Sequence, residues 1–322
     1  IILDNDVFES CELPSGVKPL NTKWVLKRKQ NADHSWRYRG RLCAKGFLQR
    51  RGVNFFDTFA PTAKCISLRL FISLCACMCL LTRQLDVKTA FLYAKLDEYI
   101  YIKIPKGMKG GNNPFGLSAE ALRRGRGPYL RLKKSFYGLK QAPRNWYRLL
   151  RDFLIRQGFT NLLSETCLFV KYVDGDMIIV LVFVDDILLA CKQGRPLDEL
   201  VAQFAREFKI KDSGEVNLYL SININIDRSR GTAYLDQTEY ILAMWNRFNG
   251  VENRGVRSAF QENWKIHPEE ERATMTAADW TFARNFPYRE LVGSLLFISM
   301  CTRAAICYQV HYLSRFLEEP PK

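Results

Sequence analysis

The sequence predicts a fold of the α+β class, in which helices accompany antiparallel strands. Apolar runs at 167–173 and 176–184 are joined by Asp174 and Gly175, a pair typical of a tight hairpin turn. Residues 142–158 carry apolar side chains at helical spacing, with Pro143 near the start and Gly158 at the end. At 322 residues the chain is long for one compact domain, so about two or three subdomains are expected.

The other elements follow from the same two periodicities. Further strands are expected where polar and apolar residues alternate, at 23–30, 36–47, 84–87, 99–104 and within 216–235. Further helices are expected where apolar residues recur at helical spacing, at 65–81, 196–208, 236–248 and 288–316. Residues 107–128 are rich in Gly, Asn and Arg and predict a loop, with a short helix at 118–123.

The net charge of +15 predicts a polyanionic partner. Lys and Arg gather in two blocks, 23–51 and 123–156, and aromatic residues lie among those of the second block. Such blocks suit a track of phosphates. The alternatives are a charge that only aids solubility, and a membrane surface. A membrane-surface protein would need basic amphipathic helices, whereas these blocks fall mostly on predicted strands and loops.

Cysteine usage indicates a reducing, intracellular setting. The ten cysteines form no C-x-x-C pair and only three His are present, which argues against a zinc site. Cys75, Cys77 and Cys79 lie in an apolar stretch and are predicted to be buried thiols. The longest apolar run, 70–81, is too short to span a bilayer. Because the first residue is Ile, we expect a segment of a longer polypeptide.

Three carboxylates stand where apolar strands are predicted. Residues 177–191, "MIIVLVFVDDILLAC", place Asp185 and Asp186 between two apolar runs, and Asp86 ends another predicted strand in "QLDVKTAF". An unpaired buried carboxylate is costly, so these residues need a turn or a positive partner. An ordinary strand-ending turn would explain Asp86 alone. Together with the basic blocks, the three indicate a site for Mg²⁺, and two ions about 4 Å apart would suit in-line attack on phosphorus.

An ordered set of motifs resembles one enzyme family. "FVDD" resembles the catalytic signature of reverse transcriptases, and "LDVKTAFL" resembles their first catalytic segment. With "TKWVLKRK", "YRGRLCAKGFLQRRGVNFFDTFAPTAK", "LKKSFYGLKQAPRNWY" and "YRELVGSLLFISMCTR", they resemble the polymerase of Ty1/copia-type retrotransposons over 13–316. The resemblance implies a right-hand polymerase whose antiparallel palm sheet carries the catalytic aspartates. It assigns 1–61 and 94–141 to fingers, 62–93 and 142–222 to palm, 223–290 to thumb, and 291–322 to the start of a connection toward an absent ribonuclease H domain.

The resemblance also implies the reaction and its cofactor. Deoxynucleotides would pass from dNTPs to a primer 3′-hydroxyl on an RNA or DNA template, within a Pol polyprotein. Asp86, Asp185 and Asp186 would be the catalytic residues and would bind two Mg²⁺ ions, with Mn²⁺ as a substitute. The expected partners are the RNA template, the primer–template duplex, and the ribonuclease H and integrase segments of the polyprotein, with no membrane. The expected location is a cytoplasmic virus-like particle or the nucleus.

Further residues are expected to bind the nucleotide. Phe91 aligns with the aromatic steric gate that rejects a 2′-hydroxyl, although core packing would also explain it. Backbone N–H groups at Thr89 and Ala90 would hold the triphosphate. Basic residues of the fingers could also contact it, or be solvated charges. The candidates there are Arg39, Arg41 and Lys45, and those in the "SFYGLKQAP" segment are Tyr137 and Gly138.

Several positions depart from the family pattern. Phe183 replaces the usual Tyr, and Ser221 stands for the usual Gly in the primer-grip strand, 218–222, where a positive φ would strain it. The Pro-Asp pair after Arg303 and the turn glycine of "NADHSW" are missing. The alternative interpretation is therefore a catalytically inactive relic that only binds nucleic acid.

Overall fold

The computed structural model describes residues 5–30, 35–105, 129–248, 270 and 273–318. The predicted loop at 107–128, the turn at 31–34 and much of the predicted thumb lie outside these ranges. The chain divides into two compact units. Unit 1 comprises Ile1–Phe71 and Leu80–Glu215, and unit 2 comprises Ile72–Cys79 and Val216–Lys322. Helix α1 (Cys65–Cys77) contains one of the points of division.

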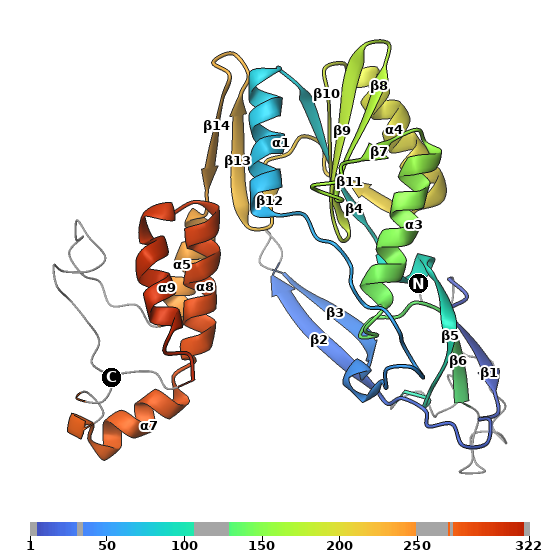
Figure 1. The fold of residues 1–322 in the computed structure, drawn as a ribbon, viewed down its shortest axis with the longest axis vertical. Helices are drawn as coiled ribbons and strands as arrows, with labels where there is room; N and C mark the ends of the chain where they lie inside the picture. Colours follow the sequence, from blue (N-terminus) through green and yellow to red (C-terminus); the bar gives the residue numbers. More distant parts are fainter. Residues whose placement is uncertain (1–4, 31–34, 106–128, 249–269, 271–272, 319–322) are drawn as a thin grey trace. The chain divides into compact units, whose positions relative to one another are not determined.

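The centre of unit 1 is a six-stranded antiparallel sheet with the order β11-β4-β10-β9-β8-β7 (Figure 1). Its central strands are almost wholly buried and apolar, which is why their sequences run without alternation. The strands are β4 (Leu81–Val87), β7 (Thr160–Asn161), β8 (Leu168–Val173), β9 (Asp176–Phe183), β10 (Asp186–Cys191) and β11 (Ile210–Asp212).

Helices α3 (Ala142–Arg156) and α4 (Gly194–Glu207) pack against this sheet. Trp146 and Phe153 of α3 and Phe204 of α4 share one buried core with alternate residues of β4, β9 and β10. Alternation along a strand puts those residues on one face, so both helices cover the same side of the sheet (Figure 1).

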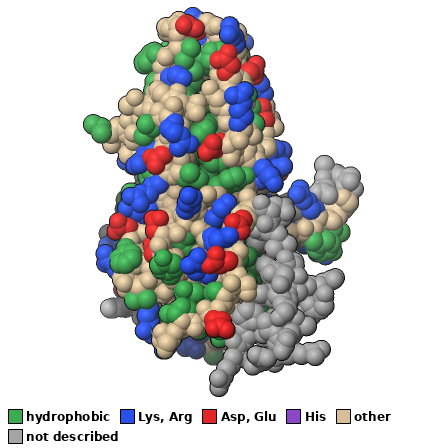
Figure 2. Space-filling model, turned by 90° about the vertical axis from the view of Figure 1, so that its right-hand side faces the viewer, with side chains coloured by type: hydrophobic (Ala, Val, Ile, Leu, Met, Phe, Trp, Pro, Cys, Tyr) green, Lys and Arg blue, Asp and Glu red, His purple; other side chains and the backbone are tan. Residues whose placement is uncertain are grey.

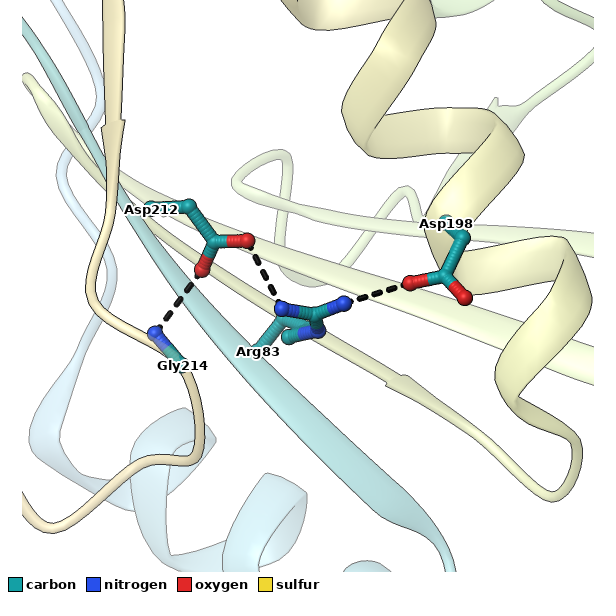
Figure 3. Close-up of polar contacts among 4 residues, drawn as sticks. All are labelled: Arg83, Asp198, Asp212 and Gly214. Carbon is teal, nitrogen blue, oxygen red and sulfur yellow. Dashed lines mark hydrogen bonds and ion pairs between the residues drawn. The ribbon is translucent and has the colours of Figure 1, made fainter.

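An ion-paired arginine joins the edge of the sheet to α4 (Figure 3). The Arg83 guanidinium, on β4, donates to Asp212 of β11 at 2.8 Å and also pairs with Asp198 of α4. The backbone N–H of Gly214 donates to the other oxygen of Asp212 at 2.8 Å. Exposed pairs of this kind add little stability one by one. Here they fix the short edge strand β11 beside β4.

A second core in unit 1 lies beneath a three-stranded sheet of order β1-β6-β5. A separate hairpin, β2–β3, contributes Leu42 and Ala44 to the same core. Short 3-10 helices η1 (Gly46–Leu48) and η2 (Ala90–Tyr93) follow β3 and β4. The strands are β1 (Phe8–Cys11), β2 (Thr22–Gln30), β3 (Trp36–Ala44), β5 (Lys95–Ile102) and β6 (Tyr129–Lys134).

Unit 2 contains a small antiparallel sheet, β12-β13-β14, and several helices. Tyr240 of α5 contacts Phe297 of α8 edge to face, and the Tyr288 hydroxyl donates to Leu313 O at 2.9 Å. These contacts join the helices to one another. The elements are β12 (Leu218–Tyr219), β13 (Ile222–Asp227), β14 (Thr232–Asp236), α5 (Thr238–Arg247), α7 (Ala277–Asn285), α8 (Tyr288–Cys301), η3 (Ala304–Ile306) and α9 (Cys307–Ser314).

The predicted α+β class is confirmed, and the aspartates lie on an antiparallel sheet as expected. Some bounds were wrong. The strand predicted at 84–87 begins at Leu81, because the helix before it ends at Cys77 and Cys79 turns the chain with a φ of 54°. The strand predicted at 36–47 ends at Ala44, where η1 follows. The division into fingers, palm and thumb stays a prediction.

The buried-thiol prediction was only partly right. Cys75 is buried, and burial raises its pKa to about 12, but Cys77 and Cys79 are exposed. The helix ends within this run, so its later residues leave the apolar face. Within the ranges that the structure describes, no helix is both long enough and apolar enough to cross a membrane.

Candidate active site

Three aspartates meet at one end of the central sheet. Asp186, the first residue of β10, is the register partner of Asp86 on β4. Asp185 precedes it in the turn after β9, and its carbonyl accepts a hydrogen bond from Val87 N at 2.9 Å. Pairing between the two strands therefore places all three residues together, although about a hundred positions separate Asp86 from the others.

The turn that carries Asp185 is strained and braced. Phe183 and Asp186 are register partners, so Val184 and Asp185 form a two-residue loop. Val184 has a φ of 57°, a conformation that a β-branched residue rarely adopts. The buried Trp146 indole N–H donates to Val184 O at 2.7 Å. Sequence reasoning missed this brace. The signal was present, since a buried Trp N–H usually has a partner.

The carboxylates lie in a setting that disfavours their charge. Desolvation, followed by the charges of Asp185 and Asp86, raises the pKa of Asp186 to about 6. Desolvation and the Asp86 charge raise the pKa of Asp185, while Arg41 and Arg39 oppose the rise. The site therefore holds more negative charge than its surroundings compensate. A bound cation would neutralise that excess charge.

The same carboxylates provide the oxygen ligands that Mg²⁺ prefers. Among the residues that the structure describes, no three His, Cys, Asp or Glu side chains are arranged to hold an ion on their own. Mg²⁺ commonly uses one or two carboxylates and completes its shell with water and phosphate oxygens. An open cluster of this composition fits that mode of binding, and it does not fit a closed protein cage.

Tyr137, Phe91 and Arg41 border the aspartates. The rings of Phe91 and Tyr137 meet edge to face at 5.1 Å between centroids. The Arg41 guanidinium carbon lies 5.6 Å from the centre of the Tyr137 ring. The Asp185 and Asp86 charges both act on the Tyr137 hydroxyl, although desolvation is the main reason that its pKa is raised. The structure thus brings these three predicted residues together with the carboxylates.

The remaining predicted residues are placed as follows. Thr89 has a φ of 57° and directly precedes η2, and Ala90, the first residue of η2, is buried in the core. Lys45 directly precedes η1, and its backbone N–H donates to Asn21 O at 2.8 Å. Arg39, like Arg41, acts on Asp185 from β3.

Gly138 is required by its surroundings. Its φ is 88°, and a Cβ at this position would lie 2.2 Å from Ala44 O. Gly46 lies equally close, since a Cβ on Gly46 would be 1.9 Å from Gly138 O. The Tyr137 carbonyl also accepts a hydrogen bond from Ala44 N at 2.8 Å. The end of β3 and the Tyr137 segment are therefore in backbone contact, which explains both glycines.

The β2–β3 hairpin has two different faces. The register pairs Lys27 with Arg39 and Arg28 with Tyr38, so alternate positions share a face. One face carries Lys23, Lys27, Arg37, Arg39 and Arg41. The other carries exposed Trp24, Leu26, Trp36 and Tyr38, with Arg28 3.9 Å above the Trp36 ring. No acidic residue lies on either strand, so the hairpin suits a polyanion.

The second basic block is partly neutralised. Arg131 pairs with Glu9 and Lys133 with Asp6, because β1 lies beside β6. Arg144 pairs with Asp57 at 2.9 Å. On the face that Figure 2 shows, Lys and Arg side chains are likewise interspersed with Asp and Glu. The described part of this block therefore offers less free positive charge than its sequence indicates.

Comparisons with known proteins agree on the family. The family model described as reverse transcriptase (RNA-dependent DNA polymerase) matches residues 5–261. The chain is 34% identical over 320 residues to the retrovirus-related Pol polyprotein from transposon TNT 1-94 of Nicotiana tabacum, covering 99% of this chain and 23% of that protein. It is 33% identical to the Pol polyprotein from transposon RE1 of Arabidopsis thaliana, over 95% of this chain and 19% of that protein. The putative transposon Ty5-1 protein of Saccharomyces cerevisiae is 31% identical, over 73% of this chain and 70% of that protein.

Three aspartates that meet at one end of an antiparallel sheet fit the class of polymerases that transfer nucleotides. The chain belongs to the reverse transcriptase (RNA-dependent DNA polymerase) family, of the Ty1/copia type. It spans about a fifth to a quarter of the length of the two plant Pol polyproteins. A solved foamy viral protease-reverse transcriptase in complex with double-stranded DNA aligns with a TM-score of 0.41 and 10% identity, over 99% of this chain and 43% of that one. That similarity is too low to assign a fold by itself.

Proposed function

We propose that this chain is an RNA-directed DNA polymerase that adds deoxynucleotides to a primer 3′-hydroxyl. The observation that carries the proposal is the register pairing of Asp86 with Asp186, beside Asp185 in the braced turn. Three carboxylates in one desolvated cluster have no evident structural use, because like charges opposite one another weaken a sheet. They are the groups that this reaction needs.

The bordering residues would bind the incoming nucleotide. Arg41 and Arg39 supply positive charge beside Asp185 and would contact the triphosphate. Phe91 is held by the Tyr137 ring, and both would shape the pocket for the sugar. Further contacts to the nucleotide are proposed at the edge of the same site. They would come from the backbone of Thr89, Ala90 and Gly138 and from the charge of Lys45. Phe91 would then exclude a 2′-hydroxyl by its volume.

Asp86, Asp185 and Asp186 would hold two Mg²⁺ ions, which Mn²⁺ could replace. Bound there, the metal would lower the pKa of the attacking hydroxyl and neutralise developing charge on the phosphate. The carboxylates must be ionised for this, and the raised pKa values of Asp185 and Asp186 show that burial disfavours their charged forms when no cation is bound.

The nucleic acid would lie along the β2–β3 hairpin, whose basic face includes the two arginines that act on Asp185. We propose an RNA template and a primer–template duplex as partners. The relatives are Pol polyproteins, so other segments of such a polyprotein, ribonuclease H and integrase among them, are proposed as further partners, in a virus-like particle or the nucleus.

Primer extension tests the proposal. The parent protein, with Mg²⁺, a poly(A) template and an oligo(dT) primer, should incorporate dTTP, and Asp185→Asn should not. Omission of Mg²⁺ should stop the parent as well. A parent that binds the duplex with a steep salt dependence but does not extend the primer would favour the alternative, an inactive relic that only binds nucleic acid.

A further inference from the structure

Two glutamines of unit 1, neither of them hydrogen-bonded to the three aspartates, form a buried clamp. The side chains of Gln49, which follows η1, and Gln141, which precedes α3, are 5% and 1% exposed. The Gln49 amide N–H₂ donates to Gln141 Oε1 at 3.0 Å and to Asn54 O at 3.2 Å. The Gln141 amide donates to the same Asn54 O at 2.9 Å and to Glu98 Oε2 at 3.0 Å.

Every polar group of the clamp is used. Each amide nitrogen has two acceptors, and Gln49 Oε1 accepts from the backbone N–H of Lys140 at 2.8 Å. The Glu98 carboxylate and the Asn54 carbonyl can only accept hydrogen bonds here, which fixes the orientation of both amides. A fully satisfied buried network rigidifies its surroundings, and loss of one member leaves the others unpaired at considerable cost.

The clamp acts on the segment that borders the candidate active site. Lys140 is two residues from Gly138 and three from Tyr137. Its backbone hydrogen bond to Gln49 therefore anchors this segment at its C-terminal end. Gly46, three residues before Gln49, also lies close to Gly138, where a Cβ on Gly46 would be 1.9 Å from Gly138 O. The chain from the end of β3 to η1 therefore holds the Tyr137 segment at two points. Tyr137 in turn contacts Phe91 and Arg41.

We propose that Gln49 and Gln141 are positioning residues, which set the place of Tyr137 and Gly138 for the incoming deoxynucleoside triphosphate. The proposal rests on the proposed polymerase function and adds to it two residues that contact neither the three aspartates nor, by this geometry, the nucleotide. Their effect passes through Lys140 and the backbone of the Tyr137 segment.

The first test is kinetic and uses Gln49→Met, Gln141→Met and the double variant. Methionine keeps the length of the side chain and removes its hydrogen bonds. The apparent KM for dTTP should rise about tenfold in each single variant, the size of effect of one buried hydrogen bond. The kcat at saturating dTTP and the affinity for primer–template should stay unchanged. Because the two amides act as one unit, the double variant should be no worse than either single variant.

Gln237→Met is the matched control. Gln237 is also buried, at 2% exposure, and accepts a hydrogen bond from the Thr302 hydroxyl at 2.8 Å, but it belongs to unit 2. The Gln237→Met variant should have a lower thermal stability than the parent and the same KM for dTTP. A KM that rises equally in Gln237→Met, or KM effects that multiply in the double variant, would overturn the proposal.

The second test does not depend on activity. Hydrogen–deuterium exchange of the Lys140 amide should be slow in the parent and faster in Gln49→Met, with the sheet amides of β9 and β10 unaffected. If this amide is equally protected in both proteins, the clamp does not hold the segment and the proposal fails. A parent that shows the protection but no polymerase activity would refute the proposed function and leave the structural clamp standing. Faster exchange with an unchanged KM in an active enzyme would show that the clamp does not position the nucleotide.

Discussion

Asp86 and Asp186 face one another as register partners on adjacent antiparallel strands. Two like charges at directly opposed positions of a sheet repel one another and weaken the pairing. Asp185, next in the chain, adds a third negative charge and further raises the pKa of Asp186. The end of the central sheet is therefore less stable than its apolar strands would allow. This loss of stability is the cost of holding three carboxylates together in the candidate active site.

Replacing one of these charges should stabilise the fold and abolish the reaction. Asp186→Asn removes the repulsion at the same size, so the metal-free melting temperature near neutral pH should rise while primer extension disappears. Asp174→Asn is the control, because Asp174 is an exposed turn residue at the other end of β9 and Asn tolerates its φ of 51°. It should leave activity intact. Differential scanning calorimetry and primer extension measure the two effects, and a destabilised Asp186→Asn protein would contradict this account.

Stability should depend on pH and Mg²⁺ together. The pKa of Asp186 is about 6 in the folded protein, above its ordinary value of 3.8, so the folded state binds this proton more tightly than the unfolded state. Its contribution to stability is therefore present below about pH 4 and is lost as the pH rises to about 6. Mg²⁺ needs the ionised carboxylate, so the rise in melting temperature caused by Mg²⁺ should be larger at about pH 7.5 than at about pH 5. The same rise at both pH values, or one that survives in Asp186→Asn, would be inconsistent with the site.

The hydrogen bond that braces the turn carrying Asp185 should matter for both stability and rate. Trp146→Phe retains an aromatic ring in the core but removes the hydrogen bond to Val184 O, at a cost of about 1–2 kcal/mol in unfolding free energy. With the turn less constrained, the primer-extension rate should fall further than the loss of folded protein explains. Trp245→Phe, on an exposed residue of α5, is the control and should change neither quantity. Urea unfolding and single-turnover extension provide the measurements.

The sequence identified the aspartates because carboxylates within apolar runs are conspicuous in themselves, whereas the pairing of Asp86 with Asp186 across about a hundred positions came only from the structure. It could not identify the brace of Val184 or the roles of Gln49 and Gln141, because each depends on contacts between residues far apart in the chain. The exposure of Cys77 and Cys79 was missed for a local reason, since the apolar run continues past the end of the helix. The weakening of the second basic block by Asp6 and Glu9 also required the pairing of β1 with β6.

Two glycines with the same backbone conformation should respond differently to Ala. Gly138 and Gly175 have φ values of 88° and 84°, but a Cβ on Gly138 would lie 2.2 Å from Ala44 O, whereas Gly175 has no atom within 4 Å. Gly175→Ala should cost about 1 kcal/mol from its backbone alone. Gly138→Ala should cost about 2–4 kcal/mol and weaken dTTP binding, because backbone must move. Equal losses in chemical denaturation would show that the contact with Ala44 is not tight.

The turn formed by Leu220 and Ser221, in the strand expected to be the primer grip, offers a gain in stability. Tyr219 and Ile222 are register partners, so Leu220 and Ser221 form a two-residue loop, and their φ values of 49° and 63° confirm the strain expected at Ser221. Such turns favour Gly, so Ser221→Gly should stabilise the protein by about 0.5–1 kcal/mol. Ser164→Gly, at another exposed serine whose φ is not positive, should give no gain in stability. There Gly only adds flexibility to the unfolded chain, and no backbone strain is relieved to offset that cost. Melting temperatures compare the two variants.

If the parent is an active polymerase whose strained turn holds the primer, Ser221→Gly should also raise the KM for primer–template. If the strain is only drift in an inactive copy, the variant should gain stability without any change in duplex binding.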